Sequence, residues 1–266
     1  MAGGAAGSAG AGSTPEGLTA GLRLGASMTL LQFSIGALND LRDRYADSRS
    51  KPDKPIPAGR VSVGGARIVT ALSASVGLVL AAASGLPVLV LAVLVLGIGY
   101  AYDLALKGTA WSWLPFAVGI PLLPVYGWLG AVGTLPPAFL VLVPAGVVEG
   151  AALAVANALV DEERDRAAGV SSIATALGRG ASGSLVVALQ AVVVAVAVAA
   201  ALVAGLPAGW LVLVLGAGTV VVGGALVAAT AGSAPRTRSA AWTAQAAGAA
   251  GLVVSWLGGL VASGAA

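Results

Sequence analysis

The chain has 266 residues, of which 58% are hydrophobic and only 9% are charged, whereas about a quarter of a soluble domain is charged, so the composition predicts a protein built for lipid. It contains neither cysteine nor histidine, which excludes a disulfide framework, a thiolate metal site and the usual near-neutral general base. The net charge of +3 comes from a few clustered basic residues and gives no argument for nucleic-acid binding.

The apolar stretches of the chain predict an all-α, polytopic transmembrane bundle of about eight spans. A Gly/Ala-rich tail, residues 1–17, is expected to be disordered. The transmembrane domain, residues 18–266, is expected to begin with a helix from about Leu18 to the first acidic motif. Seven more stretches follow, each near the ~20 residues that cross a bilayer: Gly64–Ser84, Leu86–Tyr102, Trp111–Val132, Pro136–Val160, Ser184–Ala204, Pro207–Thr230 and Ala240–Val261.

The distribution of charge predicts the orientation of these spans. All of the 14 basic residues except Arg23 fall in alternate connecting segments, which the positive-inside rule assigns to the cytoplasm. Both acidic motifs lie on that same face. Heavy use of Ala, Val, Gly and Arg suggests a bacterial genome. We therefore expect an integral protein of a bacterial cytoplasmic membrane, with its active site facing the cytoplasm.

The first acidic motif directly follows an apolar run. Asn39, Asp43 and Asp47 recur at intervals of four residues, which places them on one face of a helix, and Asp40 lies beside them. Oxygen ligands of this kind suit magnesium, which usually binds one or two carboxylates together with substrate phosphates. Taken alone, the motif is equally well explained as a solvated, charged helix end.

The second acidic motif repeats this spacing after another apolar run. Asn157, Asp161 and Asp165 again recur at intervals of four residues. Chance repetition is improbable in a chain with 11 acidic residues, so the two motifs are interpreted as two walls of one metal site. The two helices that carry them could also mark two related halves of the chain.

Basic residues beside these motifs would make the site suitable for a diphosphate. Lys107 is the strongest candidate, because it is the only basic residue between the third and fourth spans. Each arginine is equally well explained by membrane topology. The candidate cations are Arg42, Arg44, Lys54, Arg60, Lys107, Arg164 and Arg166.

The rest of the substrate is expected to be apolar, like an isoprenoid tail. Aromatic faces could stabilise the allylic cation left when diphosphate departs; the candidates are Tyr100, Tyr102, Trp111, Trp113, Tyr126 and Trp128. The tryptophans are equally typical of a membrane interface. Glu149 is the one charge expected inside a span, roughly 18 Å from Asp161 along a helix. It could shape an acceptor pocket, take up a proton late in the reaction, or lie near the far interface.

These residues resemble the UbiA superfamily of intramembrane prenyltransferases. The first signature of that family, NDxxDxxxD, is met by Asn39 to Asp47, and the basic segment Lys54-Pro-Ile-Pro-Ala-Gly-Arg60 follows it. The second, DxxxD, is met by Asp161 and Asp165. The segment from Tyr100 to Lys107 resembles a third family element.

The resemblance implies a helical bundle with a central cavity, and Mg²⁺ held by the two motifs. It further implies that an isoprenyl diphosphate is ionised and its prenyl group is transferred to an aromatic or lipid acceptor. We expect catalysis to depend on Asp40, Asp43, Asp161 and Lys107. Family members usually have nine spans, so either a first helix has been lost or the start site is misplaced.

Two other functions stay open. A membrane terpene cyclase would use the same metal motifs on a prenyl diphosphate without an acceptor. A cation-coupled transporter is a more remote alternative, because it would place several carboxylates near the middle of the bilayer.

Overall fold

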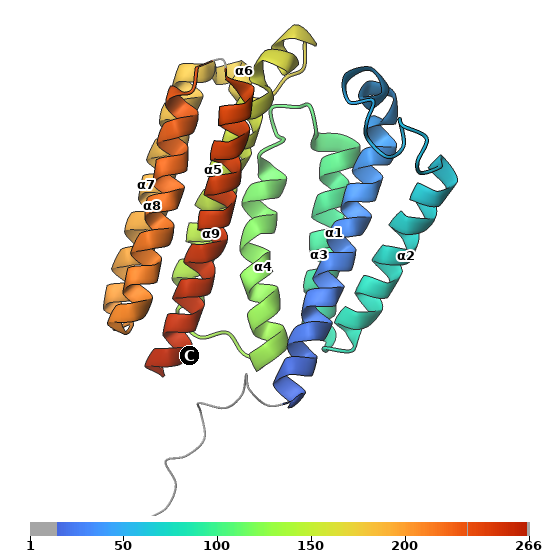
Figure 1. The fold of residues 1–266 in the computed structure, drawn as a ribbon. Helices are drawn as coiled ribbons and strands as arrows, with labels where there is room; N and C mark the ends of the chain where they lie inside the picture. Colours follow the sequence, from blue (N-terminus) through green and yellow to red (C-terminus); the bar gives the residue numbers. More distant parts are fainter. Residues whose placement is uncertain (1–14, 233, 265–266) are drawn as a thin grey trace, which may run out of the picture. The chain divides into compact units, whose positions relative to one another are not determined.

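The computed structural model describes residues 15–232 and 234–264, which form nine α-helices and one π-helical turn and contain no strand (Figure 1). The helices are α1 (Pro15–Ser50), α2 (Val63–Ala82), α3 (Leu86–Ala101), the π turn η1 (Tyr102–Leu106), α4 (Leu114–Val132), α5 (Phe139–Ala167), α6 (Ile173–Leu177), α7 (Arg179–Val203), α8 (Ala208–Thr230) and α9 (Pro235–Ser263). The predicted all-α fold is confirmed. Residues 15–17 belong to α1, and the remainder of the expected tail, residues 1–14, lies outside the described residues.

Seven helical segments are long and apolar enough to cross a membrane: α2, α3 with η1, α4, α5, α7, α8 and α9. They correspond to seven of the eight stretches expected from the sequence. The remaining stretch is α1, which spans 36 residues but is not among them, since its first half contains Arg23 and Gln32 and its second half carries the first acidic motif. Several helices also extend beyond the apolar runs that predicted them, since α5 continues to Ala167 and α9 begins at Pro235.

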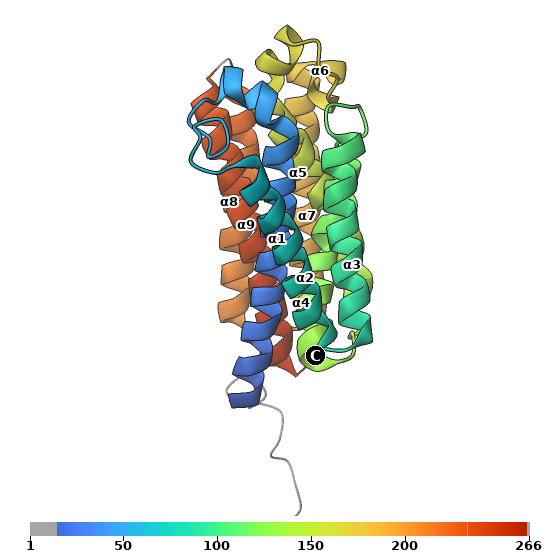
Figure 2. The same ribbon diagram turned by 90° about the vertical axis from the view of Figure 1, so that its right-hand side faces the viewer.

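The described residues form two compact units. The N-terminal unit comprises residues 15–107 and 125–134, with α1, α2, α3 and η1 running side by side (Figure 2). Its helices approach closely at small residues, since Leu31 lies against Gly77 and the hydroxyl of Ser27 donates to the Gly77 carbonyl oxygen at 2.7 Å. Leu24, Leu31 and Val88 are among the buried residues of its core.

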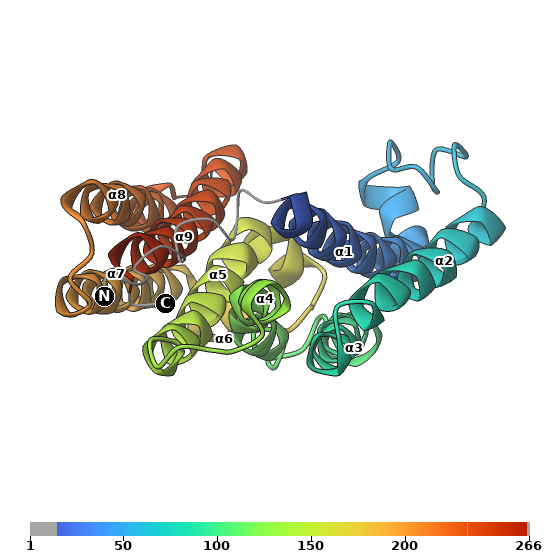
Figure 3. The ribbon, with the colours of Figure 1, turned by 90° about the horizontal axis from the view of Figure 1, so that it is seen from below.

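The C-terminal unit comprises residues 108–124, 135–232 and 234–264. Within it α9 packs along α8 and α5, and α7 packs against α5 and α8 (Figure 3). Val214, Val221 and Trp256 are part of its main apolar core. The start of α4 lies directly on α5, because Gly150 has no side chain to keep it away from the backbone of Phe116. This unit contains the second acidic motif, at the end of α5.

Candidate active site

The first acidic motif occupies the last turns of α1, where Lys54 from the following loop joins it. The Lys54 ammonium lies 2.7 Å from Oδ1 of Asp40 and 2.9 Å from Oδ2 of Asp47. These carboxylates are seven residues apart, so they lie two turns apart on one helix face and a single cation can bridge them. The basic loop predicted to accompany the motif is thus brought against it.

Lys54 keeps its positive charge in this position. Partial burial acts to lower its pKa, but hydrogen bonds and charge attraction from Asp40 and Asp47 outweigh burial, so the pKa is raised above its ordinary value. An ammonium group therefore stands between two carboxylates predicted to bind a metal cation.

A second set of contacts joins α1 to the end of α3 and η1. Asn39 Nδ2 donates to Oδ1 of Asp103 at 2.7 Å, and the Lys107 ammonium pairs with Asp43. Both contacts join residues 64 positions apart, so the two segments run in parallel with a constant register. The π turn closes when the Lys107 N–H donates to the Tyr102 carbonyl oxygen at 2.8 Å. Such turns are frequent at functional sites.

Asp103 belongs to this cluster although the sequence did not single it out. Its side chain is buried, and its Oδ2 has no hydrogen-bond partner. Asp103 falls within the span-length segment Leu86–Leu106. The expectation that Glu149 is the one charge inside a span is therefore wrong. The available signal was an acid four residues before Lys107, at the spacing that places both on one helix face.

The other predicted cations of this unit make different contacts. Arg44 donates to the Leu41 carbonyl oxygen at 2.6 Å and lies over the ring of Tyr45, at 4.3 Å from its centroid. Arg60 donates to the carbonyl oxygen of Asp53. Arg42 is exposed at the motif itself. Within the part of the chain that the structure describes, the motif forms its ion pairs with Lys54 and Lys107 and not with these three arginines.

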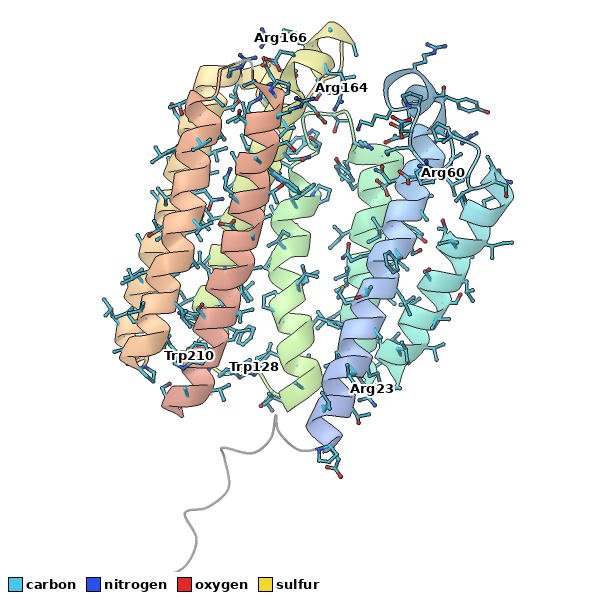
Figure 4. The ribbon with its side chains drawn as sticks, viewed as in Figure 1. Arg23, Arg60, Trp128, Arg164, Arg166 and Trp210 are labelled. Atoms are coloured by element: carbon cyan, nitrogen blue, oxygen red, sulfur yellow. The ribbon has the colours of Figure 1, made fainter. Side chains whose placement is uncertain are left out.

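The aromatic candidates are divided along the N-terminal unit. The hydroxyl of Tyr100 lies 2.7 Å from that of Ser34, close to the motif end of α1, and Tyr102 is the first residue of η1. Tyr126 donates instead to the hydroxyl of Ser27 at 2.8 Å, about 18 Å from Asn39 along α1. Figure 4 shows Trp128 at the end of this unit opposite Arg60. Tyr100 and Tyr102 thus lie near the first motif, whereas Tyr126 and Trp128 lie far from it within the same unit, and which of these rings faces a substrate stays a prediction.

Trp111 and Trp113 come just before α4 in the C-terminal unit. Trp111 is exposed and Trp113 is half-buried. This is typical of residues at a membrane interface.

The second acidic motif lies in the last turns of α5. Asp161 pairs with Arg164, three residues further along the helix. Asn157 and Asp165 are half-buried on the same helix. Figure 4 shows Arg164 and Arg166 at one end of the C-terminal unit and Trp210 at the other. The sequence predicts that this motif and the first form one site, and that arrangement stays a prediction.

An ion-pair network beside the second motif was not predicted. Glu162 is buried and pairs with Arg166 and with Arg179, the latter at 2.8 Å, while Glu163 pairs with Arg179 and Arg238. Arg238 is fully buried at the start of α9. The network therefore ties α5, α7 and α9 together at the level of the motif. The sequence offered one indication of this network: the carboxylates at 162 and 163 do not belong to the predicted metal-binding pattern and therefore needed other partners.

Glu149 lies apart from the second motif, on the same helix. Its side chain is buried and lines an apolar cavity of about 450 Å³ formed by α4, α5, α7 and α9 within the C-terminal unit. Its position on α5 agrees with the predicted depth. Whether it binds substrate stays a prediction.

The donor set of the first motif suits a hard divalent cation. Within residues 15–232 and 234–264, no three acidic side chains converge closely enough to form a metal site by themselves. Magnesium does not need three, because it combines one or two carboxylates with phosphate oxygens and water. The carboxylates of Asp40, Asp43 and Asp47 already hold cationic ammonium groups, so the residues present fit such an ion.

Several solved structures share this fold. The chain superposes on a UbiA homolog from Aeropyrum pernix K1 with a TM-score of 0.69 and 22% identity, over 88% of each chain. A UbiA homolog from Archaeoglobus fulgidus, bound to GPP and Mg²⁺, gives 0.68 and 18%, over 91% of this chain and 87% of that one. A structure described as digeranylgeranylglyceryl phosphate synthase gives 0.70 and 16%, over 92% and 87%.

The sequence itself gives the family. No match was found among curated proteins. The profile of the UbiA prenyltransferase family, however, matches residues 1–250, which is nearly the whole chain. Together with the seven span-length helices and the motifs at the ends of α1 and α5, this match shows that the chain is an integral membrane protein and belongs to the UbiA prenyltransferase family.

Proposed function

We propose that this protein is a Mg²⁺-dependent intramembrane prenyltransferase that ionises an isoprenyl diphosphate and transfers the prenyl group to an aromatic or lipid acceptor. One observation carries the proposal. The carboxylates of the first motif, Lys54 from the basic loop and Lys107 from η1 converge at one end of the N-terminal unit. Alternating carboxylates and ammonium groups are suited to a ligand that combines metal cations with phosphate oxygens.

The two motifs would hold the metal ions together. Asn39, Asp40, Asp43 and Asp47 would bind from α1, and Asn157, Asp161 and Asp165 from α5. Mg²⁺ held there would supply positive charge that stabilises the diphosphate as it departs. The archaeal homolog bound to GPP and Mg²⁺, and its complex with DMAPP and Mg²⁺, support this ligand set.

The lysines would change partners when the substrate binds. Lys107 and Lys54 now donate to carboxylates, and the same ammonium groups can donate to diphosphate oxygens once divalent cations balance those carboxylates. Arg42, Arg44, Arg60 and Arg164 would add positive charge around the diphosphate. The rings of Tyr100 and Tyr102 would face the allylic cation.

The location of the site supports an amphiphilic substrate. The second motif ends the span-length apolar helix α5, and the first directly follows the apolar run from Met28 to Leu38 of α1. A diphosphate would therefore sit at the membrane surface while its chain lies among apolar side chains. The basic residues near the motifs favour the cytoplasmic face of a bacterial membrane.

The test is incubation of the purified protein with Mg²⁺ and geranyl, farnesyl or geranylgeranyl diphosphate, with and without acceptors, followed by organic extraction. Consumption that requires an aromatic or lipid acceptor is the expected result. A cyclised hydrocarbon or alcohol formed without an acceptor would make the protein a terpene cyclase. No consumption under any condition, by a protein that melts cooperatively, would contradict both activities.

A further inference from the structure

The last turns of α5 carry more carboxylates than the proposed metal site uses. Asp161 and Asp165 are the predicted ligands, and Glu162 and Glu163 lie between them. These neighbouring acids repel one another, and at the C-terminal end of a helix they also face the negative end of the helix dipole. The segment therefore depends on cations from other helices for its order.

The helix ends directly after these residues. The Val170 N–H donates to the Asp165 carbonyl oxygen at 2.8 Å and the Gly169 N–H donates to that of Arg166 at 3.2 Å, with Gly169 at a φ of +67°. This pairing is the Schellman motif, which closes many helices. Asp165 thus belongs to the final turn of α5, and the ends of helices open more readily than their centres. Metal ligands in such a turn need support from outside it.

Arg238, in the first turn of α9, supplies one such support. Its Nη1 donates to Oε1 of Glu163 at 3.2 Å and its Nη2 pairs with Oε2, so the guanidinium holds both carboxylate oxygens. Bidentate pairs of this kind fix geometry as well as charge. Nη1 also donates to the Gly232 carbonyl oxygen. Because the Arg238 side chain is fully buried, this cation has a fixed position from which to hold Glu163.

The place of Glu163 on the helix gives this contact its effect. Glu163 is two residues from Asp161 and two from Asp165, so it projects about 160° around the helix axis from each of them. An anchor that holds Glu163 against α9 therefore turns both aspartates away from α9. Glu162 is held in the same way by Arg179 of α7, at 2.8 Å. The two arginines together fix the rotation of the end of α5.

We propose that Arg238 is a positioning residue of the second motif, which acts through Glu163 to fix the rotation of the last turns of α5 and to keep the carboxylates of Asp161 and Asp165 paired on one face. The inference rests on the proposed function for the role of those carboxylates in binding Mg²⁺. The restraint on α5 is a property of the protein alone and is measurable without metal or substrate.

Arg238→Gln separates positioning from simple charge. Removal of a cation near the motif would, by charge alone, strengthen Mg²⁺ binding, whereas loss of positioning weakens it. We expect the Mg²⁺ concentration at half-maximal binding of geranyl thiolodiphosphate, an unreactive analogue, to rise roughly 10-fold, as the loss of supporting partners does at metal sites. Arg236→Gln, at an exposed cation two residues earlier, is the matched control and should cause no rise. An unchanged or lower Mg²⁺ requirement in Arg238→Gln would overturn the proposal.

Hydrogen exchange of the full chain in detergent, without Mg²⁺ or diphosphate, tests the restraint directly. The amides of residues 162–167 should exchange ~10-fold faster in Arg238→Gln, while those of residues 214–221, in the core of α8, keep the wild-type rate. Equal acceleration in both segments would make Arg238 a residue of general stability and overturn the proposal. If the wild-type protein does not bind the analogue, the proposed function is contradicted, and the exchange rates alone decide whether Arg238 holds the end of α5.

Arg238→Lys keeps the buried charge but replaces the planar fork that holds both oxygens of Glu163. It should fall between the wild-type protein and Arg238→Gln in both measurements, and it provides the test if Arg238→Gln does not fold. Wild-type values for Arg238→Lys in both measurements would mean that a charge at this position suffices, which would overturn the positioning role.

Discussion

At the scale of single residues, Lys107 and Asp43 form an ion pair whose partners are both partly exposed. Such pairs contribute little to stability, typically less than ~1 kcal/mol. We therefore expect Lys107→Ala to weaken the apparent affinity for prenyl diphosphate by roughly 10-fold or more, because a charge-assisted hydrogen bond to phosphate is lost, while the melting temperature changes little. The comparison is made by substrate titration and thermal unfolding. Lys51→Ala, at an exposed cation just after the first motif, is the control. An unchanged affinity would reduce Lys107 to a topology residue.

Asp103 gives a second residue-scale prediction, because it fixes a predicted metal ligand without being one. Its Oδ1 accepts from Asn39, so Asp103→Ala should release the Asn39 side chain and lower turnover by ~10–100-fold, as the loss of supporting partners does at metal sites. Asp103→Asn keeps an oxygen that can accept this bond and should restore part of the activity. The Mg²⁺ concentration at half-maximal rate should rise in Asp103→Ala. A drop in melting temperature with no change in this Mg²⁺ dependence would make Asp103 a structural residue only.

The chemistry of the site could be predicted from the sequence where the residues repeat in one helix. The four-residue spacing of Asn39, Asp43 and Asp47 fixes their common face whatever the tertiary structure is. Asp103 could not be recognised in the same way, since its role comes from the register between α1 and α3. Spacing along one helix carries no information on which residue of a neighbouring helix lies opposite.

At the scale of helices, the contact between α4 and α5 depends on Gly150. A Cβ at this position would overlap the carbonyl group of Phe116 and lie 2.8 Å from Cα of Ala117, both backbone atoms that cannot rotate away. Gly150→Ala should therefore destabilise the protein by about 1–3 kcal/mol, the usual cost of overpacking. Gly216→Ala is the control, because that glycine has open space around it, and the gain in helix propensity should leave stability equal or slightly higher. Thermal unfolding in detergent measures both, and equal melting temperatures would show that α4 shifts at no cost.

The existence of the helices was easier to predict than their ends. Apolar runs near the length of a bilayer identify α2 to α5 and α7 to α9, because only a helix satisfies the backbone in lipid. The runs stop where charges begin, but α5 continues to Ala167, where buried Glu162 is paired with arginines. The short helix α6 was not expected. It has five residues and depends on a local capping box between Ser172 and Thr175, which hydropathy does not detect.

At the scale of the whole molecule, the predicted reaction requires residues from both compact units. The first motif, Lys54 and Lys107 belong to the N-terminal unit, and the second motif belongs to the C-terminal unit. Within the described residues, Asp40, Asp43 and Asp47 pair with lysines of the N-terminal unit, and Asp161 pairs with Arg164 of the C-terminal unit. If Mg²⁺ and diphosphate join the two motifs, the coupling between them appears only when these ligands are bound.

A double-mutant cycle tests that coupling. Asp43→Asn and Asp161→Asn should each abolish turnover, and should each weaken Mg²⁺-dependent binding of an unreactive geranyl thiolodiphosphate by roughly 10-fold or more. If both carboxylates act on one metal–diphosphate cluster, the first substitution already disrupts that cluster. The double variant should then lose much less affinity than the product of the two single-variant losses. Asp43→Asn combined with Asp53→Asn, in the exposed loop, should be additive. Additive losses for Asp43 and Asp161, or full activity in either single variant, would mean that the two motifs do not form one site.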